Sequence, residues 1–310
     1  MTTKMKAKAD QMAAENQNIH SFSSDNTADY ASDIQAILSH RHDLGWDYWT
    51  TPDKRLLKGS PFSAHGSALM LLELGMDPAE PILKAVADLF FDAWRPDGRF
   101  KLYPSGAIYP CHTAHAVSLL CAMGYAQDPR IRTTFQHLLD TRHSDGGWRC
   151  NKFSFGRGPE TECSNPLPTL TVLNAYRYID NKVQDGVFDV SELDLAVEFL
   201  LEHWRIRKPI GPCHYGMGTL FMQVEYPFGN YNLFQYVYVL SFYEKARKDE
   251  RFLEALRALQ GKLVDGRIVV ERAVPKLAKL RFCEKGKKSA LGTKRYGGIV
   301  KNIGVAPFPF

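Results

Sequence analysis

Apolar and polar residues follow one another along the chain in a pattern that predicts paired helices. The segment 71–78 (LLELGMDP) is echoed by the segment 119–129 (LLCAMGYAQDP). In each segment an apolar helix ends at a glycine, which accepts the left-handed conformation, and Asp followed by Pro then starts the next helix. The same helix hairpin is therefore predicted twice, about fifty residues apart, a period typical of helical repeats.

Two looser hairpins follow. In the third, the apolar segment 167–179 precedes a helix that Ser191 is predicted to cap. In the fourth, the apolar segment 231–243 precedes a helix that Asp249 is predicted to cap. The turns that close the hairpins are Asp97-Gly98, Asp145-Gly146-Gly147-Trp148, the segment 209–212, and Asp265-Gly266. A short helix from Asp29 to Ser39 is expected before the first hairpin.

The two helices of a hairpin differ in how their apolar residues are distributed. Residues 233–242 are apolar nearly all round, whereas residues 249–262 carry apolar residues on one face only. This combination predicts an all-α fold and, within it, an α/α toroid. We expect a partial or complete barrel of about four to five tandem helix hairpins, with apolar inner helices and amphipathic outer helices. An open solenoid of the same hairpins is the alternative.

The composition sets the domain organisation. The 310 residues are 45% hydrophobic, enough for one large core, so we expect a single toroid domain over residues 29–305. Residues 1–28 are polar, without apolar periodicity, and are predicted to form a disordered tail. No apolar run approaches the ~20 residues of a membrane span, and the N-terminus lacks the apolar core of a signal peptide. We therefore expect a cytoplasmic protein with no transmembrane segment.

The charge pattern points away from nucleic acid. The formal net charge is only +5, and basic residues gather only in the segment 276–301. That segment is expected to be a solvated face, unless Arg281, Lys285 and Lys288 hold a phosphate at the cavity rim. The partner that we expect is a small apolar molecule, and the sequence leaves the oligomeric state open.

The turns and the alternating helices carry a resemblance to a known family. The Asp145 to Trp148 turn and the Asp97 to Phe100 turn resemble the repeats of terpenoid cyclases and of protein prenyltransferase β subunits. The chain is also similar to shorter bacterial prenyltransferase-like and squalene-cyclase-like proteins. Like them, it combines a Gly-Trp-x-Cys turn at Cys150, a second cysteine at Cys163, and a Gly-Met-Gly-Thr segment at 216–219. The resemblance covers residues 60–265 and implies a toroid.

The resemblance does not extend to the known chemistry. The sequence has no Asp-x-Asp-Asp acid of the cyclases and no Asp-x-Cys zinc pair of the prenyltransferases. The paired-aspartate magnesium motif is also absent.

Cysteines at the turns between helices are candidate metal ligands. A cytosolic chain with six cysteines is expected to hold reduced thiols or a metal rather than disulfides. Thiolates with or without imidazole suit zinc, and an iron-sulfur cluster is the alternative cofactor. Each cysteine could instead be a small buried hydrophobe. The candidate ligands are Cys111, Cys150, Cys163, Cys213 and His214.

Loops that enter the inner helices surround the mouth of a toroid cavity, so we look there for a site. The candidate catalytic residues are Cys111, His112 and His115, a thiol with imidazoles near it in sequence. Aromatic, imidazole and amide side chains near these loops are candidate substrate ligands. They are Tyr109, His65, Asn165, Tyr226, Asn230, Tyr231 and Tyr236.

Together these features predict an enzyme that binds an apolar substrate in the cavity, with a Cys/His metal centre at its mouth. An isoprenoid is one candidate for that substrate. The alternative is a non-catalytic ligand-binding or scaffold protein, with a structural metal or none. An open coordination position would favour the enzyme, and four saturated thiolates would favour the structural site.

Overall fold

The computed structural model describes residues 30–149, 162–179, 190–226 and 229–304, and these residues are mostly helical. The predicted N-terminal tail lies outside the described residues. The helices are α2 (Ala31–Ser39), α3 (Ala64–Glu73), α4 (Pro81–Asp92), α5 (Pro110–Ala122), α6 (Pro129–Asp140), α7 (Pro166–Tyr176), α8 (Asp194–Ile206), α9 (Leu233–Leu240), α10 (Glu244–Arg247), α11 (Glu250–Gln260) and α12 (Ala290–Ile303). The prediction of a mainly helical fold is confirmed.

Short elements complete the fold. The strands are β1 (Glu225–Tyr226), β2 (Leu263–Val264), β3 (Arg267–Ile268) and β4 (Arg272–Ala273). β1 pairs with β4 in parallel, and β2 pairs with β3 in an antiparallel hairpin. Three 3-10 turns are also described, namely η3 (Val190–Leu193), η4 (Pro275–Leu277) and η5 (Arg281–Cys283). No helix among the described residues is both long and apolar enough to span a bilayer.

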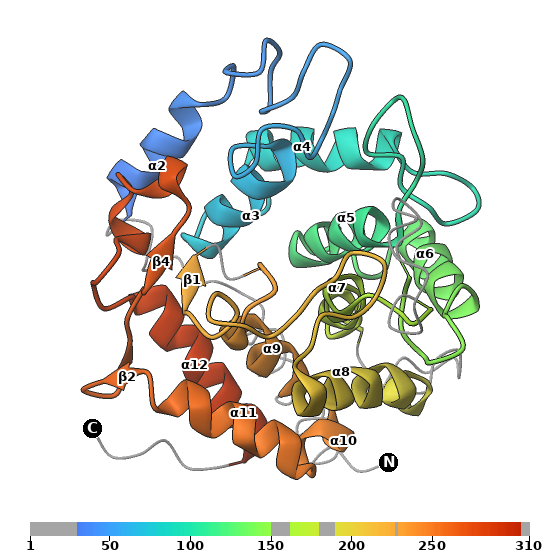
Figure 1. The fold of residues 1–310 in the computed structure, drawn as a ribbon. Coiled ribbons are helices and arrows are strands. Elements are labelled where there is room, and N and C mark those ends of the chain that lie inside the picture. The colour runs from blue at the N-terminus through green and yellow to red at the C-terminus, as the bar shows by residue number, and fades with distance from the viewer. Residues whose placement is uncertain (1–29, 150–161, 180–189, 227–228, 305–310) are drawn as a thin grey trace, which may run out of the picture.

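Figure 1 shows the helices following one another around a common centre. Each hairpin packs an inner helix against an outer one, as α3 with α4, α5 with α6, α7 with α8, and α9 with α11. The inner helices also pack against one another, α3 on α5, α5 on α7 and α7 on α9. α12 packs against α9 and continues this inner series.

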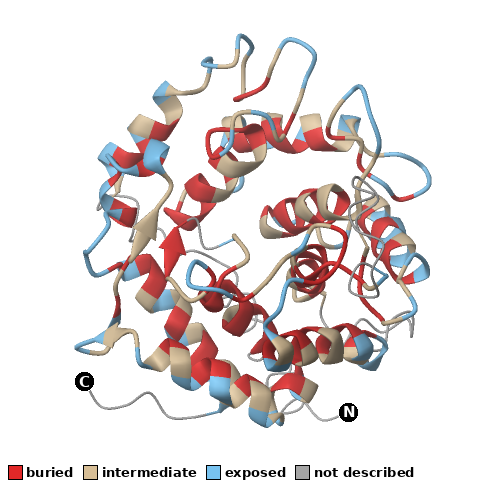
Figure 2. Ribbon diagram, in the orientation of Figure 1, coloured by how far each residue is buried: buried red, intermediate tan, exposed pale blue. Residues whose placement is uncertain are grey.

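Burial follows the predicted difference between inner and outer helices (Figure 2). α7 is buried at nearly every position, whereas α11 buries only Phe252, Ala255, Leu256 and Leu259, one stripe at helical spacing. An all-round apolar helix needs neighbours on every side, and a position inside the ring provides them. The hydrophobic core takes residues from both series of helices.

The predicted helix starts are right in two hairpins and wrong in two. Asp128 caps α6 by accepting from the Arg130 amide at 2.9 Å, and Asp249 caps α11 by accepting from the Arg251 amide at 2.9 Å. α4 instead begins at Pro81, because Asp77 bonds to the Ala79 amide within a turn. In the third hairpin η3 comes first and α8 begins at Asp194, so Ser191 is not its cap.

The turn that ends at Trp148 joins α6 to the start of α7. The Trp148 indole is buried and donates to the Leu138 carbonyl at 2.8 Å, while its amide donates to Thr169 Oγ1 at 3.1 Å. Gly146 has φ +85°, and an added Cβ would lie 2.3 Å from the Leu195 Cβ. The glycine is therefore required both for its conformation and for the close approach of α8.

The basic C-terminal segment returns to the first helix. Asp33 of α2 accepts from the backbone amides of Arg281 and Phe282, both at 3.0 Å. Figure 1 shows α2 beside the chain that leads into α12, so the first and last parts of the described chain are in contact. The sequence pattern indicated no elements here, because the segment is short of apolar periodicity.

Candidate functional site

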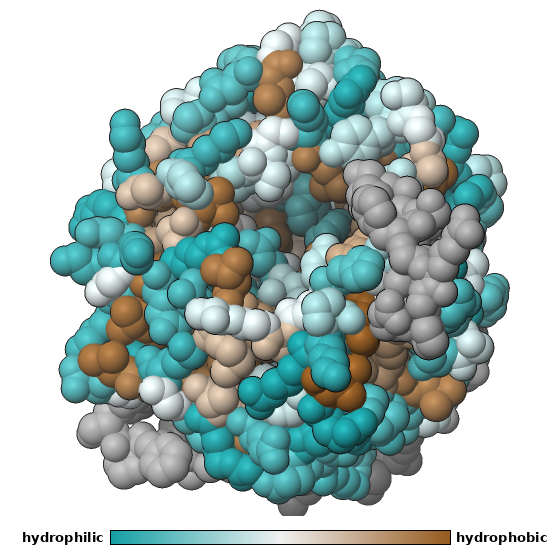
Figure 3. All heavy atoms as spheres, viewed as in Figure 1, coloured by the Kyte–Doolittle hydropathy of each residue, from teal (hydrophilic) through white to brown (hydrophobic). Residues whose placement is uncertain are grey.

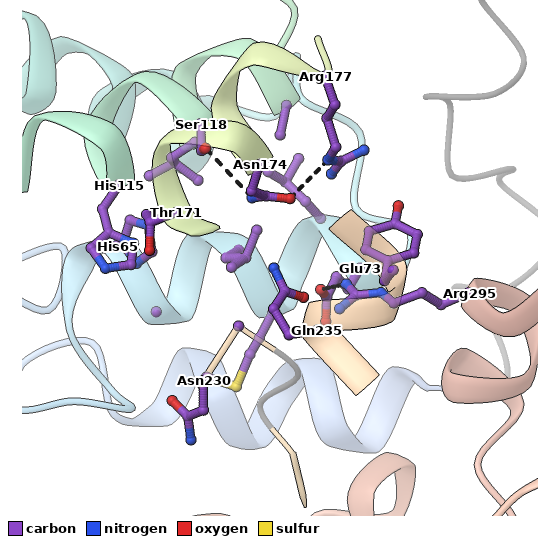
Figure 4. Close-up of a pocket in the computed structure, with 18 of the residues that line it drawn as sticks. His65, Glu73, His115, Ser118, Thr171, Asn174, Arg177, Asn230, Gln235 and Arg295 are labelled. Carbon is purple, nitrogen blue, oxygen red and sulfur yellow. Dashed lines mark hydrogen bonds and ion pairs between the residues drawn. The ribbon is translucent and has the colours of Figure 1, made fainter. Parts of the chain in front are cut away.

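A cavity of about 460 Å³ lies among the inner helices α3, α5, α7, α9 and α12. Figure 3 shows the surface hollowed near the middle of the ring, and Figure 4 shows the side chains inside. Its apolar wall includes Leu69, Met70, Leu119, Ala122 and Phe242. Its polar and charged wall includes His65, Glu73, His115, Ser118, Thr171, Asn174, Arg177, Tyr226, Asn230, Gln235, Tyr238, Lys294, Arg295 and Lys301.

One end of the cavity, called the histidine end, is formed by His65, His115, Thr171 and Asn230 (Figure 4). The rings of His65 and His115 meet edge to face with their centroids 5.0 Å apart. Burial lowers the pKa of His65 to about 3, helped by the neighbouring His115, and burial lowers the pKa of His115 to about 4. Both imidazoles are therefore neutral at pH 7.

The opposite end, called the arginine end, is formed by Arg177, Tyr238, Arg295, Glu73 and Tyr226. Arg295 forms an ion pair with Glu73, whose other oxygen accepts from the Tyr226 hydroxyl at 2.6 Å. Burial and the adjacent Glu73 carboxylate raise the pKa of Tyr226, so the hydroxyl stays protonated and donates. Burial is the largest single influence on Arg295 and disfavours its charge, but Glu73 together with the neighbouring tyrosines outweighs burial, and the pKa of Arg295 is raised.

Arg177, the C-cap residue that follows α7, is held differently. Its Nε donates to Asn174 Oδ1 at 2.9 Å and its Nη2 donates to the Tyr178 hydroxyl at 2.6 Å. The guanidinium carbon lies 4.1 Å from the Tyr178 ring centroid and 5.3 Å from the centroids of Tyr238 and Phe242. Within the part of the chain that the structure describes, Arg177 therefore has aromatic and amide neighbours but no carboxylate.

Between the two ends, α9 contributes one buried amide. The Gln235 amide N–H donates to Asn232 Oδ1 at 2.9 Å, which caps the helix and fixes where the side chain begins. Gln235 is 6% exposed, and its side-chain Oε1 has no hydrogen-bond partner among the described residues. Figure 4 shows this side chain reaching into the cavity.

A second pocket of about 390 Å³ adjoins the histidine end, and both pockets share His115 and Asn230. Phe221, Tyr231 and the exposed Leu220 line it. The Tyr231 hydroxyl lies 2.6 Å from His203 Nδ1. The loop between α8 and α9 therefore forms part of the wall at the histidine end.

Some of the predicted substrate ligands line these pockets and others do not. His65, Tyr226 and Asn230 line the main cavity, and Tyr231 lines the second pocket. Tyr236 is buried in the core with its hydroxyl on the Leu200 carbonyl at 2.9 Å. Tyr109 and Asn165 are the residues that precede α5 and α7, and they line neither pocket.

The predicted catalytic residues separate in the same way. His115 reaches the cavity, whereas Cys111 and His112 lie in the first turn of α5 and line neither pocket. The His112 ring packs instead against Tyr109, with centroids 4.9 Å apart.

The proposed metal ligands do not form a group among the described residues. No set of three or more His, Cys, Asp or Glu side chains in this part of the chain is placed to hold a metal ion. Cys111, Cys163 and Cys213 are half-buried, and His214 is exposed. Burial raises the pKa of the Cys163 thiol. Cys150 lies outside the described residues, so the metal centre stays a prediction.

The sequence pattern did not identify Glu73, Arg177, Gln235 and Arg295 as site residues. One signal was available, because Glu73 is the only acidic residue of α3 and Gln235 is the only amide of α9, in helices that are otherwise largely apolar. A polar residue in a buried helix needs a partner or a ligand.

No family model matches the sequence, and no curated protein matches it. The interpretation of the cavity therefore depends on its own geometry.

Proposed function

We propose that the chain is an α/α toroid and an enzyme whose small substrate occupies the central cavity. The inner and outer series of helices support the toroid, as does the contact between α2 and the segment before α12. The resemblance of the turns to cyclase and prenyltransferase repeats agrees with it. The apolar wall suits an apolar substrate body, for which an isoprenoid is one candidate.

The observation that carries the enzymatic proposal is the pair of neutral imidazoles at the histidine end. His65 and His115 come from successive inner helices and both line the cavity. An imidazole with so low a pKa is not protonated to imidazolium at pH 7, so it cannot act as a general acid from that form. Its single N–H can still donate a hydrogen bond to negative charge that develops on a substrate oxygen. In this proposal one imidazole stabilises that oxygen and the other orients it.

Untargeted turnover separates an enzyme from a binding protein. Wild-type protein and a His65→Gln/His115→Gln variant are incubated with a total small-molecule extract, and mass spectrometry follows which compounds disappear. We expect at least one apolar compound to be converted by the wild type and about 100-fold more slowly by the variant. His137→Gln, on the outer helix α6, is the matched control.

The contrary result is a compound that copurifies with the protein and is never converted. This result would support the alternative function, a non-catalytic ligand-binding or scaffold protein.

The cysteine centre is a separable part of the proposal. Zinc, or an iron-sulfur cluster, would be held by Cys111, Cys150, Cys163 and Cys213, with His214 as a further ligand. Metal analysis of protein purified anaerobically, without added metal, is expected to give about one equivalent, lost in Cys111→Ala and Cys163→Ala. Protein without metal, and variants of unchanged stability, would remove the centre and leave the cavity proposal intact.

A further inference from the structure

We propose that the arginine end is an anion subsite that binds one carboxylate group of an amphipathic ligand. The inference deepens the proposed function, because the same ligand would reach the histidine end with its other terminus. At the arginine end, two guanidinium groups face a single carboxylate, that of Glu73.

Arg177 carries the uncompensated charge. It forms no ion pair with any described residue, and its Nη1 has no hydrogen-bond acceptor there. Half-buried Arg130 and Arg251 have acidic partners, Asp128 and Asp249. Half-buried Arg247 has no acidic partner among the described residues, but it donates to the Ser241 carbonyl at 3.1 Å and does not line the cavity. Buried charges in proteins are generally paired. A guanidinium that faces a cavity without a counterion from the described residues therefore marks the place for a ligand anion.

Aromatic rings hold Arg177 without neutralising it. Ring faces attract a cation, but they offer no lone pair for its N–H groups. Asn174 fixes the orientation of Arg177 from the side and is itself within 3.5 Å of Ser118 Oγ. The guanidinium is thus pre-positioned by a neutral side chain, and the planar fork suits a carboxylate.

The pairing of Arg295 with Glu73 limits how much negative charge a ligand must bring to the subsite. Its guanidinium carbon lies 4.8 Å from the same Tyr238 ring that Arg177 approaches at 5.3 Å. Since Glu73 already offsets Arg295, the two guanidinium groups and Glu73 together leave one positive unit, that of Arg177, while Lys294 and Lys301 add positive charge elsewhere on the cavity wall. A singly charged carboxylate balances the charge of Arg177.

The helix rise sets the length of the ligand. His65 and Glu73 stand eight residues apart on α3, so the two ends are about 12 Å apart at 1.5 Å per residue. The wall between them combines apolar side chains with the polar groups of Ser118, Asn174 and Gln235, and the Gln235 Oε1 has no partner among the described residues. The ligand class is therefore a monocarboxylate with an apolar body of about this length.

Matched carboxylates and alcohols test the subsite directly. The probes are hexanoate, octanoate, decanoate and dodecanoate with the corresponding primary alcohols. Their dissociation constants at pH 7 come from displacement of the neutral fluorophore N-phenylnaphthylamine. A charged hydrogen bond that the alcohol cannot make predicts about 10-fold or tighter binding of the best carboxylate over its alcohol.

Arg177→Met should abolish that preference and leave the alcohol affinity unchanged. Arg205→Met, an exposed arginine of α8 paired with Glu202, should keep it. Equal affinities for carboxylate and alcohol in the wild type would overturn the anion subsite whether or not the variants fold. That outcome would leave the cavity proposal standing, because the alcohols would still bind.

If neither the fluorophore nor any probe binds, the subsite and the substrate cavity both fail. If the carboxylates bind as expected but no compound is turned over, the subsite holds and the enzymatic proposal fails.

Discussion

The two ends of the cavity contain ionisable groups that respond to burial in opposite ways. At the histidine end, burial removes the charge, since the pKa of His65 falls to about 3 and that of His115 to about 4. At the arginine end, burial cannot remove the charge, because a guanidinium is not deprotonated in proteins. Each arginine must find a partner instead.

The difference shows which groups stabilise the fold and which are available to a ligand. Arg295 has its partner in Glu73 and belongs to the structure. Arg177 has rings and an amide, and its charge is available to a ligand. The neutral imidazoles need no counterion, so a substrate can bind beside them without displacing a counterion.

The largest expected effect comes from breaking the ion pair at the arginine end. Glu73→Gln leaves Arg295 without its carboxylate, and both side chains are more than four-fifths buried, with relative exposures of 10% and 17%. Loss of one partner from a buried pair typically costs 3–5 kcal/mol, so we expect about 3 kcal/mol less free energy of unfolding. Urea denaturation followed by circular dichroism measures the loss.

Two controls make the comparison sharper. Glu73→Gln/Arg295→Met removes both charges and should recover part of the lost stability. Glu244→Gln breaks an exposed pair with Lys248 on α10 and should change the stability by less than about 0.5 kcal/mol. If Glu73→Gln lost as little stability as Glu244→Gln, Arg295 would not depend on Glu73.

The next effect concerns pH at the histidine end. The pKa values of both imidazoles lie below the ordinary value of 6.5, so between these values the unfolded chain binds protons that the folded chain does not. The free energy of unfolding therefore stays level above pH 6.5, as far as these groups are concerned, and falls as the pH drops. By pH 5 each imidazole should have cost about 1–2 kcal/mol.

His65→Gln tests this dependence by its difference from the wild type. Other titrating groups change the stability of both proteins by the same amount. These groups are the carboxylates elsewhere and the buried His203, whose pKa is also lowered to about 4. The variant should lose less stability than the wild type between pH 7 and pH 5. Parallel curves would mean that His65 is protonated equally in both states and is not buried as a neutral group.

The sequence predicted the helices better than it predicted the cavity. The helical hairpins were readable because caps such as Asp128 and Asp249 act on amides two residues away. Contacts between residues so close in sequence can be recognised from the sequence alone. The misplaced start of α4 shows the limit, since Asp77 forms a similar local bond in a turn and the helix begins three residues after Pro78.

The arginine end depends on contacts between residues that are distant in the chain. Arg295 lies in a basic segment that the sequence pattern favours as a solvated face, yet α12 brings it to Glu73, 222 positions earlier. His115 was a candidate catalytic residue, and it does line the cavity. His112, three residues earlier on α5, was an equal candidate and packs on Tyr109 instead. Residues three apart lie on nearly the same face of a helix, so what separates the two is their position along α5: His112 lies in the first turn, and His115 lies one turn further along.

The smallest effect is expected midway between the ends, at Gln235. Its Oε1 is buried without a partner among the described residues, and an unsatisfied buried acceptor typically costs 1–3 kcal/mol. Gln235→Leu should raise the free energy of unfolding by about 1 kcal/mol and leave the effects at both ends unchanged. Urea denaturation is again the measurement. A decrease instead would mean that the amide has a partner in the folded protein, such as a bound water. The middle of the cavity would then be a third polar site between the two ends.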